Sequence, residues 1–245
     1  MNSNKGFSTQ NLHRTFILLS IFAIAMGILE GIVAVYLRKL YYPEGFHFPL
    51  TLLAPEMLKV EWLREIATIV MLGSVAWIAG NNFIQRLSFF LFTFAVWDIF
   101  YYVLLKWLLG WPLSWLTWDI LFLIPVPWLG PVLAPVICSL TMIVMAVLFT
   151  YLPVKGHSVT INLWEWILIL SGSALIFFTF IRDYMQLILR NGIISHGESP
   201  EVKEQFWKDI TSFVPDHYNW LLFIAGELLI IASVYLVVKR SKVHR

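Results

Sequence analysis

Six long apolar segments restrict what this chain can fold into. They cover about residues 15–37, 61–79, 86–109, 131–152, 162–185 and 219–238. A helix needs about 20 mostly apolar residues to cross the hydrocarbon core of a bilayer, and each segment comes close to that length. The sequence therefore predicts an all-α fold, a polytopic bundle of about six transmembrane helices, in one transmembrane domain over residues 1–245.

The composition agrees with a multi-pass integral membrane protein. Hydrophobic residues make up 59% and charged residues 13% of the 245 positions, whereas soluble domains have about 45–50% and about 25%. The mean hydropathy is +0.77. We therefore expect the lipid bilayer to be the main partner of the chain.

Two shorter segments differ from the spans. Residues 112–125 are apolar but too short to cross the membrane, and prolines follow at once. Proline blocks helix continuation, so this segment is predicted to be a half-helix or a re-entrant segment. Residues 199–213 have the apolar spacing of a short amphipathic helix on the outer membrane surface.

The basic C-terminal sequence "VVKRSKVHR" sets the expected orientation. Lysine and arginine near the ends of spans favour the cytoplasmic side, and six spans place both termini on one side. The chain is therefore expected in the cell (inner) membrane, that is, the plasma membrane, with both termini cytoplasmic. The connections near 39–60, 110–130 and 186–218 then lie outside.

In this topology the intramembrane charges share one depth, the extracytoplasmic half, and Glu165 at the inner start of the fifth span is the exception. A charged side chain at the centre of a transmembrane helix costs about 2.5–3.5 kcal/mol, so these groups must pair, become neutral or face water. Glu30 is the clearest case, because it shares a helix face with Gly27 and Gly31. That small-xxx-small spacing is typical of close helix packing, which directs Glu30 into the bundle.

These intramembrane carboxylates predict a polar cavity shared by several helices. Acids outnumber bases at this depth, so we expect either protonated carboxyls or a bound cationic group. The predicted catalytic residues are Glu30, Glu65, Asp98 and Glu227. The predicted substrate-binding residues are Arg38, Arg64, Tyr101, Tyr102, Trp118, Asp119, Arg182 and Asp183.

Other classes of site have little support in the sequence. The histidines are scattered without HxxxH or HExxH spacing, so no metal ligand is predicted, although a carboxylate-only site for a hard cation stays open. Cys138 is the single cysteine. No phosphate-binding glycine loop is present, no nucleic-acid binding is expected, and the sequence identifies no cofactor.

Three functions remain open at this point. The first is acid–base chemistry on a lipid-soluble, isoprenoid-like substrate, as small helical membrane cyclases perform by analogy. The second is a carrier coupled to protons or cations. The third is an accessory or assembly subunit whose charges pair with other membrane subunits. An outer polar cavity without an inward polar path favours the first over the second.

Overall fold

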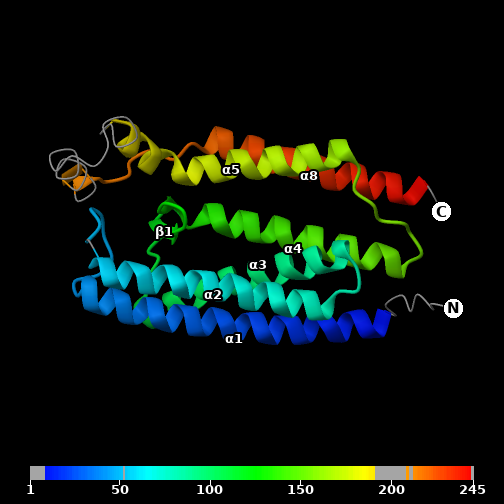
Figure 1. The fold of residues 1–245 in the computed structure, drawn as a ribbon, viewed down its shortest axis with the longest axis horizontal. Helices are drawn as coiled ribbons and strands as arrows, with labels where there is room; N and C mark the ends of the chain where they lie inside the picture. Colours follow the sequence, from blue (N-terminus) through cyan, green and yellow to red (C-terminus); the bar gives the residue numbers. More distant parts are fainter. Residues whose placement is uncertain (1–8, 52, 191–207, 210–211, 244–245) are drawn as a thin grey trace.

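Six long helices form the molecule, in a computed structural model that describes residues 9–51, 53–190, 208–209 and 212–243 (Figure 1). The helices are α1 (Thr9–Tyr41), α2 (Pro55–Ala79), α3 (Phe83–Leu109), α4 (Leu133–Val154), α5 (Leu163–Arg190) and α8 (Trp220–Val243). Each is long and apolar enough to cross a membrane. The predicted all-α, multi-pass helical bundle is confirmed.

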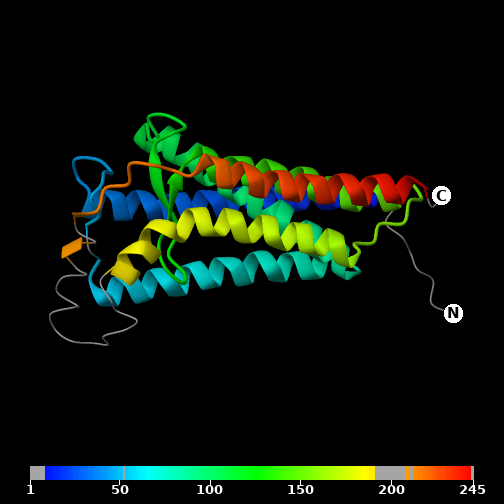
Figure 2. The same cartoon turned by 90° about the horizontal axis from the view of Figure 1, so that it is seen from above.

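The bundle has two distinct ends. The start of α1 and the end of α8 lie at one end, which we call the terminal end, together with the α2–α3 and α4–α5 connections (Figures 1 and 2). The opposite end, which we call the hairpin end, carries residues 42–54 and a β-hairpin. The six spans thus place both ends of the described chain on the same side of the bundle, as an even number of spans requires.

Close packing through glycine joins α1 to α3. A Cβ atom on Gly27 would lie 2.7 Å from the carbonyl oxygen of Trp97, and one on Gly31 would lie 2.7 Å from Leu104 Cδ2. The predicted close-packing face of α1 is therefore the face that contacts α3. A second crossing of this type joins α5 to α8, where Gly172 and Gly226 face each other.

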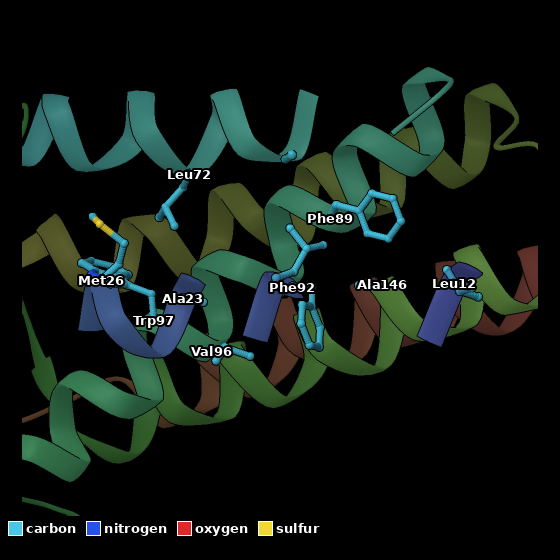
Figure 3. Close-up of a cluster of buried hydrophobic side chains, with 11 residues drawn as sticks. Leu12, Ala23, Met26, Leu72, Phe89, Phe92, Val96, Trp97 and Ala146 are labelled. Atoms are coloured by element: carbon cyan, nitrogen blue, oxygen red, sulfur yellow. The ribbon is translucent and has the colours of Figure 1, made fainter. Parts of the chain in front are cut away.

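An apolar core fills the bundle toward the terminal end (Figure 3). Helices α1, α2, α3 and α4 contribute to it, and fully buried side chains include Phe89 and Leu72. Its buried members are Leu12, Leu19, Ala23, Met26, Leu72, Ala76, Phe89, Phe92, Val96, Trp97 and Ala146. Buried hydrophobic side chains of four helices thus pack together in the half of the bundle nearer the termini.

The segment 112–125 is not the predicted half-helix. Two antiparallel strands, β1 (Trp118–Phe122) and β2 (Trp128–Pro131), form a hairpin that lies across the helices near the hairpin end (Figure 2). The tip contains Pro125 and Pro127, which lack the N–H groups that a helix would need there. Strand pairing satisfies the backbone groups of the flanking residues, so the non-helical backbone is tolerated inside the protein.

A polar contact fixes α5 to α8 at the terminal end. Asn162 and Glu165 exchange side-chain-to-backbone hydrogen bonds of 2.7 and 2.9 Å at the start of α5, the reciprocal arrangement of a capping box. The guanidinium of Arg240 also donates to both oxygens of Glu165, at 3.1 and 2.7 Å. The amphipathic helix predicted over residues 199–213 lies largely outside the described residues.

Candidate functional site

A cavity of about 370 Å³ lies within the bundle near the hairpin end. Its walls come from α1, α2, α3, the β-hairpin, the last turns of α5 and the connection between α1 and α2. Cavities that hold small molecules measure about 300–1,000 Å³ and are mostly apolar with a few polar groups. This cavity has that size and that mixture.

A polar stripe on α2 forms one wall. Arg64 donates from Nε and Nη2 to Glu61 Oε2, at 2.9 and 2.7 Å, one helical turn apart. The Arg64 guanidinium also forms an ion pair with Glu30 of α1, and Thr68 donates to Glu30 Oε2 at 3.2 Å. Glu30 therefore has a cationic partner and joins α1 to α2 inside the bundle.

Glu65, on the same stripe, contacts the hairpin. The backbone N–H of Leu123 donates to both of its carboxylate oxygens, at 3.0 and 3.1 Å. Glu65 is 4% exposed, and within the described residues it forms no ion pair. Its carboxyl group is thus held at the cavity by a neutral donor.

Arg38 at the end of α1 contacts a carboxylate and two aromatic rings. Its Nη2 donates to Asp119 Oδ1 at 2.9 Å, and its guanidinium carbon lies 3.6 Å from the Trp111 ring centroid and 4.6 Å from that of Phe46. The hydroxyl of Tyr102 donates to the other Asp119 oxygen at 3.2 Å. Burial raises the pKa of the Asp119 carboxyl, and the Arg38 guanidinium opposes that shift.

Asp98 on α3 has a different environment. Ser139 Oγ of α4 donates to Asp98 Oδ2 at 2.9 Å, and no ion pair to Asp98 occurs in the part of the chain that the structure describes. The neighbouring Trp97 is 7% exposed and lines the cavity, and its indole Nε1 has no hydrogen-bond partner among the described residues. A buried polar group without a hydrogen-bond partner lowers the stability of a fold by about 1–3 kcal/mol, and the indole N–H of Trp97 is such a group.

The cavity brings together many of the residues predicted from the sequence. Three of the four predicted catalytic residues line it, and five of the eight predicted substrate-binding residues do. The lining members are Glu30, Glu65, Asp98, Arg38, Arg64, Tyr101, Tyr102 and Asp119.

The remaining predicted residues lie elsewhere. Glu227 of α8 accepts a hydrogen bond of 2.7 Å from Thr141 of α4, away from the cavity lining. Trp118 packs against Tyr218 with ring centroids 6.0 Å apart. Arg182 and Asp183 are not among the lining residues either.

Several lining residues were missing from the predicted site. Glu61 could have been found from its spacing of three residues to Arg64, which favours an ion pair on a helix. The aromatic lining residues gave no such signal, because an aromatic residue in a span or at its end can face lipid, water or protein equally well. They are Tyr41, Tyr42, Phe46, Trp62, Trp97, Phe122 and Tyr184.

Metal binding and homology give no further assignment. Across the described residues, no three His, Cys, Asp or Glu side chains are grouped closely enough to hold a metal ion. Comparison of the chain with known protein families, curated proteins and solved structures finds no match.

Proposed function

We propose that this multi-pass membrane protein binds a lipid-soluble molecule in the cavity and transfers a proton to or from it. One observation carries the proposal. Three of the five lining carboxyls, those of Glu30, Glu61 and Asp119, have an arginine partner. Asp98 and Glu65 reach the same cavity without an ion pair to any described residue, which suits groups that gain and lose protons.

The two carboxyls have complementary roles in this proposal. Asp98, protonated, gives its proton to one carbon of a substrate double bond, and the π electrons form the new C–H bond. Glu65 then removes a proton from a carbon next to the positively charged centre, and that C–H bond becomes the shifted double bond. Glu65 then releases its proton to water and Asp98 takes one up from water, which restores both carboxyls, so the net reaction is an isomerisation that needs no further reactant. General acid–base catalysis of this kind contributes about 10²–10⁴-fold in rate.

The apolar core supports this function over that of a carrier. A carrier needs a polar path from the cavity to the other side of the membrane, whereas a cluster of buried hydrophobic side chains extends from Trp97 at the cavity to Leu12 near the terminal end (Figure 3). The ion pairs also speak against an assembly subunit, because Arg38 and Arg64 pair with carboxylates of their own chain and so do not need another subunit for charge compensation.

The proposal includes a location in the cell membrane with the terminal end in the cytoplasm. Basic residues flank the described helices there, namely Arg14, Arg86, Lys155, Lys239 and Arg240. Glu165 is the one acid that accompanies them in the described chain, and Arg240 pairs with it. The cavity then opens in the extracytoplasmic half of the bundle.

Deuterium incorporation tests the proposed proton transfer. Membranes from cells that express the wild-type protein or Asp98→Asn are incubated in D₂O, and their lipid extracts are compared by mass spectrometry. A carboxyl that exchanges with solvent will deliver deuterium to its substrate, so at least one lipid-soluble species should gain deuterium with the wild type.

The matched control is Glu56→Gln, which changes an exposed carboxylate of α2 outside the cavity lining. This variant should label like the wild type, whereas Asp98→Asn should label about 10²–10⁴-fold more slowly. Identical deuterium patterns for the wild type and Asp98→Asn would refute the proposal.

A further inference from the structure

The charges around the cavity do not balance. Five carboxyls line it, those of Glu30, Glu61, Glu65, Asp98 and Asp119, against the guanidiniums of Arg38 and Arg64, and the described lining contains no lysine or histidine. Arg38 compensates Asp119, and Arg64 is shared by Glu30 and Glu61. Even after these pairs form, the wall carries an excess of carboxyl groups.

Aromatic side chains surround these carboxyls. Nine line the cavity: Tyr41, Tyr42, Phe46, Trp62, Trp97, Tyr101, Tyr102, Phe122 and Tyr184. The faces of aromatic rings attract organic cations, and cages of such rings recognise ammonium groups. Carboxylates and aromatic faces therefore favour the same kind of ligand.

The protein already holds one organic cation in this way. The guanidinium of Arg38 lies over the rings of Trp111 and Phe46 and donates to Asp119. Asp98 and Glu65 line the same cavity as nine aromatic residues, and neither carboxyl forms an ion pair with a described residue.

Two further features indicate an occupant with a polar end and an apolar end. Trp97 lines the cavity and also belongs to the apolar core, so this part of the wall presents a mostly apolar aromatic surface beside the Asp98 carboxyl. Trp62 lines the cavity from the outer turns of α2 while 41% of it stays exposed. Trp62 therefore contributes to both the cavity wall and the surface of the bundle, and an alkyl chain that follows its ring can reach hydrocarbon.

We infer that the cavity selects a positively charged amphipathic molecule, an alkyl or isoprenoid chain bearing an ammonium-like or carbocationic centre next to Asp98 and Glu65. This inference rests on the proposed function and deepens it, because protonation of a double bond creates such a centre on the substrate. A metal ion fits less well, since no cluster of three ligating side chains occurs in the described residues.

Binding of a permanent cation tests the inference separately from proton transfer. The probe is decyltrimethylammonium, and its neutral counterpart is decyldimethylphosphine oxide, with a polar head of similar size. Tryptophan fluorescence is titrated with each probe on protein in lipid nanodiscs, with empty nanodiscs as the blank. The wild type should bind the ammonium about tenfold more tightly, the usual scale of a buried cation–π contact.

Variants separate charge recognition from general binding. A bound permanent cation favours the ionised form of Asp98 over its protonated form. Asp98→Asn and Glu65→Gln should therefore each lose most of the preference for the ammonium, while Glu56→Gln should keep it. Two single variants are used so that poor folding of one leaves the other informative, and melting curves identify such a failure. Equal binding of the two probes by the wild type, or an unchanged preference in both cavity variants, would overturn the inference.

The two experiments can fail independently. An ammonium preference without deuterium incorporation would support the cationic ligand and refute proton transfer. Deuterium incorporation without an ammonium preference would support the proposed function and refute the cationic ligand.

Discussion

The backbone N–H of Leu123 donates to both carboxylate oxygens of Glu65, at 3.0 and 3.1 Å. Leu123 begins the tip of the β-hairpin, and Glu65 lies in the half of α2 nearer the hairpin end, so this contact joins the hairpin to a helix 58 residues earlier in the chain. It satisfies a backbone donor at the point where strand pairing ends, which is a requirement for non-helical backbone inside a membrane protein.

Replacement of Glu65 tests the importance of this contact. Glu65→Ala removes the acceptor and should lower the free energy of unfolding by about 1–3 kcal/mol, the cost of an unsatisfied buried donor. Glu65→Gln keeps an oxygen acceptor and should change it far less. Thermal melting in detergent measures both, with Glu56→Ala as the exposed control; equal melting of Glu65→Ala and the wild type would contradict the assignment.

Glu30 and Asp98 should respond differently to neutralisation. Glu30→Gln removes one charged partner of Arg64, while Glu61 remains as the other. The free energy of unfolding should fall by about 1.5–3 kcal/mol, the contribution of a hydrogen bond to a charged group. Asp98 has no ion pair among the described residues, and Asp98→Asn removes an expensive ionisable group from the bundle. Its melting temperature should equal or exceed that of the wild type. Similar destabilisation in both variants would show that Asp98 is ionised and held by a cationic partner.

Arg38 and Asp119 should be strongly coupled. Arg38→Met leaves the Asp119 carboxylate, which is 2% exposed, without its cation. The free energy of unfolding should fall by about 3–5 kcal/mol. Adding Asp119→Asn to Arg38→Met should recover part of that loss. A double-mutant cycle from chemical or thermal unfolding measures the coupling, expected at about 0.5–3 kcal/mol, and strictly additive effects would exclude a direct interaction.

Glycine substitutions should separate helix contact from helix propensity. Gly27→Ala would place a methyl group 2.7 Å from the backbone oxygen of Trp97, so α1 must shift. The free energy of unfolding should fall by about 1–3 kcal/mol. At Gly73 nothing lies within 4 Å of a Cβ atom. Gly73→Ala should therefore be neutral or stabilise by up to about 1 kcal/mol through helix propensity. Melting curves that rank the two variants the other way would contradict the α1–α3 packing.

Cysteine labelling checks the proposed orientation. Ser114 and Ser158 are exposed residues near the hairpin end and the terminal end respectively. In a Cys138→Ala background, Ser114→Cys should react with an impermeant maleimide on intact cells. Ser158→Cys should react only after the membrane is opened. The reverse pattern would mean that the terminal end lies outside, and labelling of both on intact cells would contradict the six-span topology.

The sequence alone determined the fold as a bundle of six long apolar helices. Runs of about 20 apolar residues can satisfy their backbone in hydrocarbon only as helices, so the six spans follow from length and composition. The spacing of Gly27, Glu30 and Gly31 also identified one inward face correctly. The half-helix predicted over residues 112–125 was wrong. Strand pairing between β1 and β2 depends on a partner segment and on the helices around it, and local composition does not specify either.

Only the tertiary structure decided which charged residues meet. In a bilayer, lipid-facing and core-facing positions are both apolar, so hydrophobic patterning does not reveal which side of a span faces the protein. Glu30 and Glu227 are both single acids in apolar helices, yet Glu30 reaches Arg64 in the cavity wall and Glu227 reaches Thr141 between α4 and α8. Their partners depend on the rotation and packing of the helices, and these are fixed by close contacts such as Gly27 against Trp97.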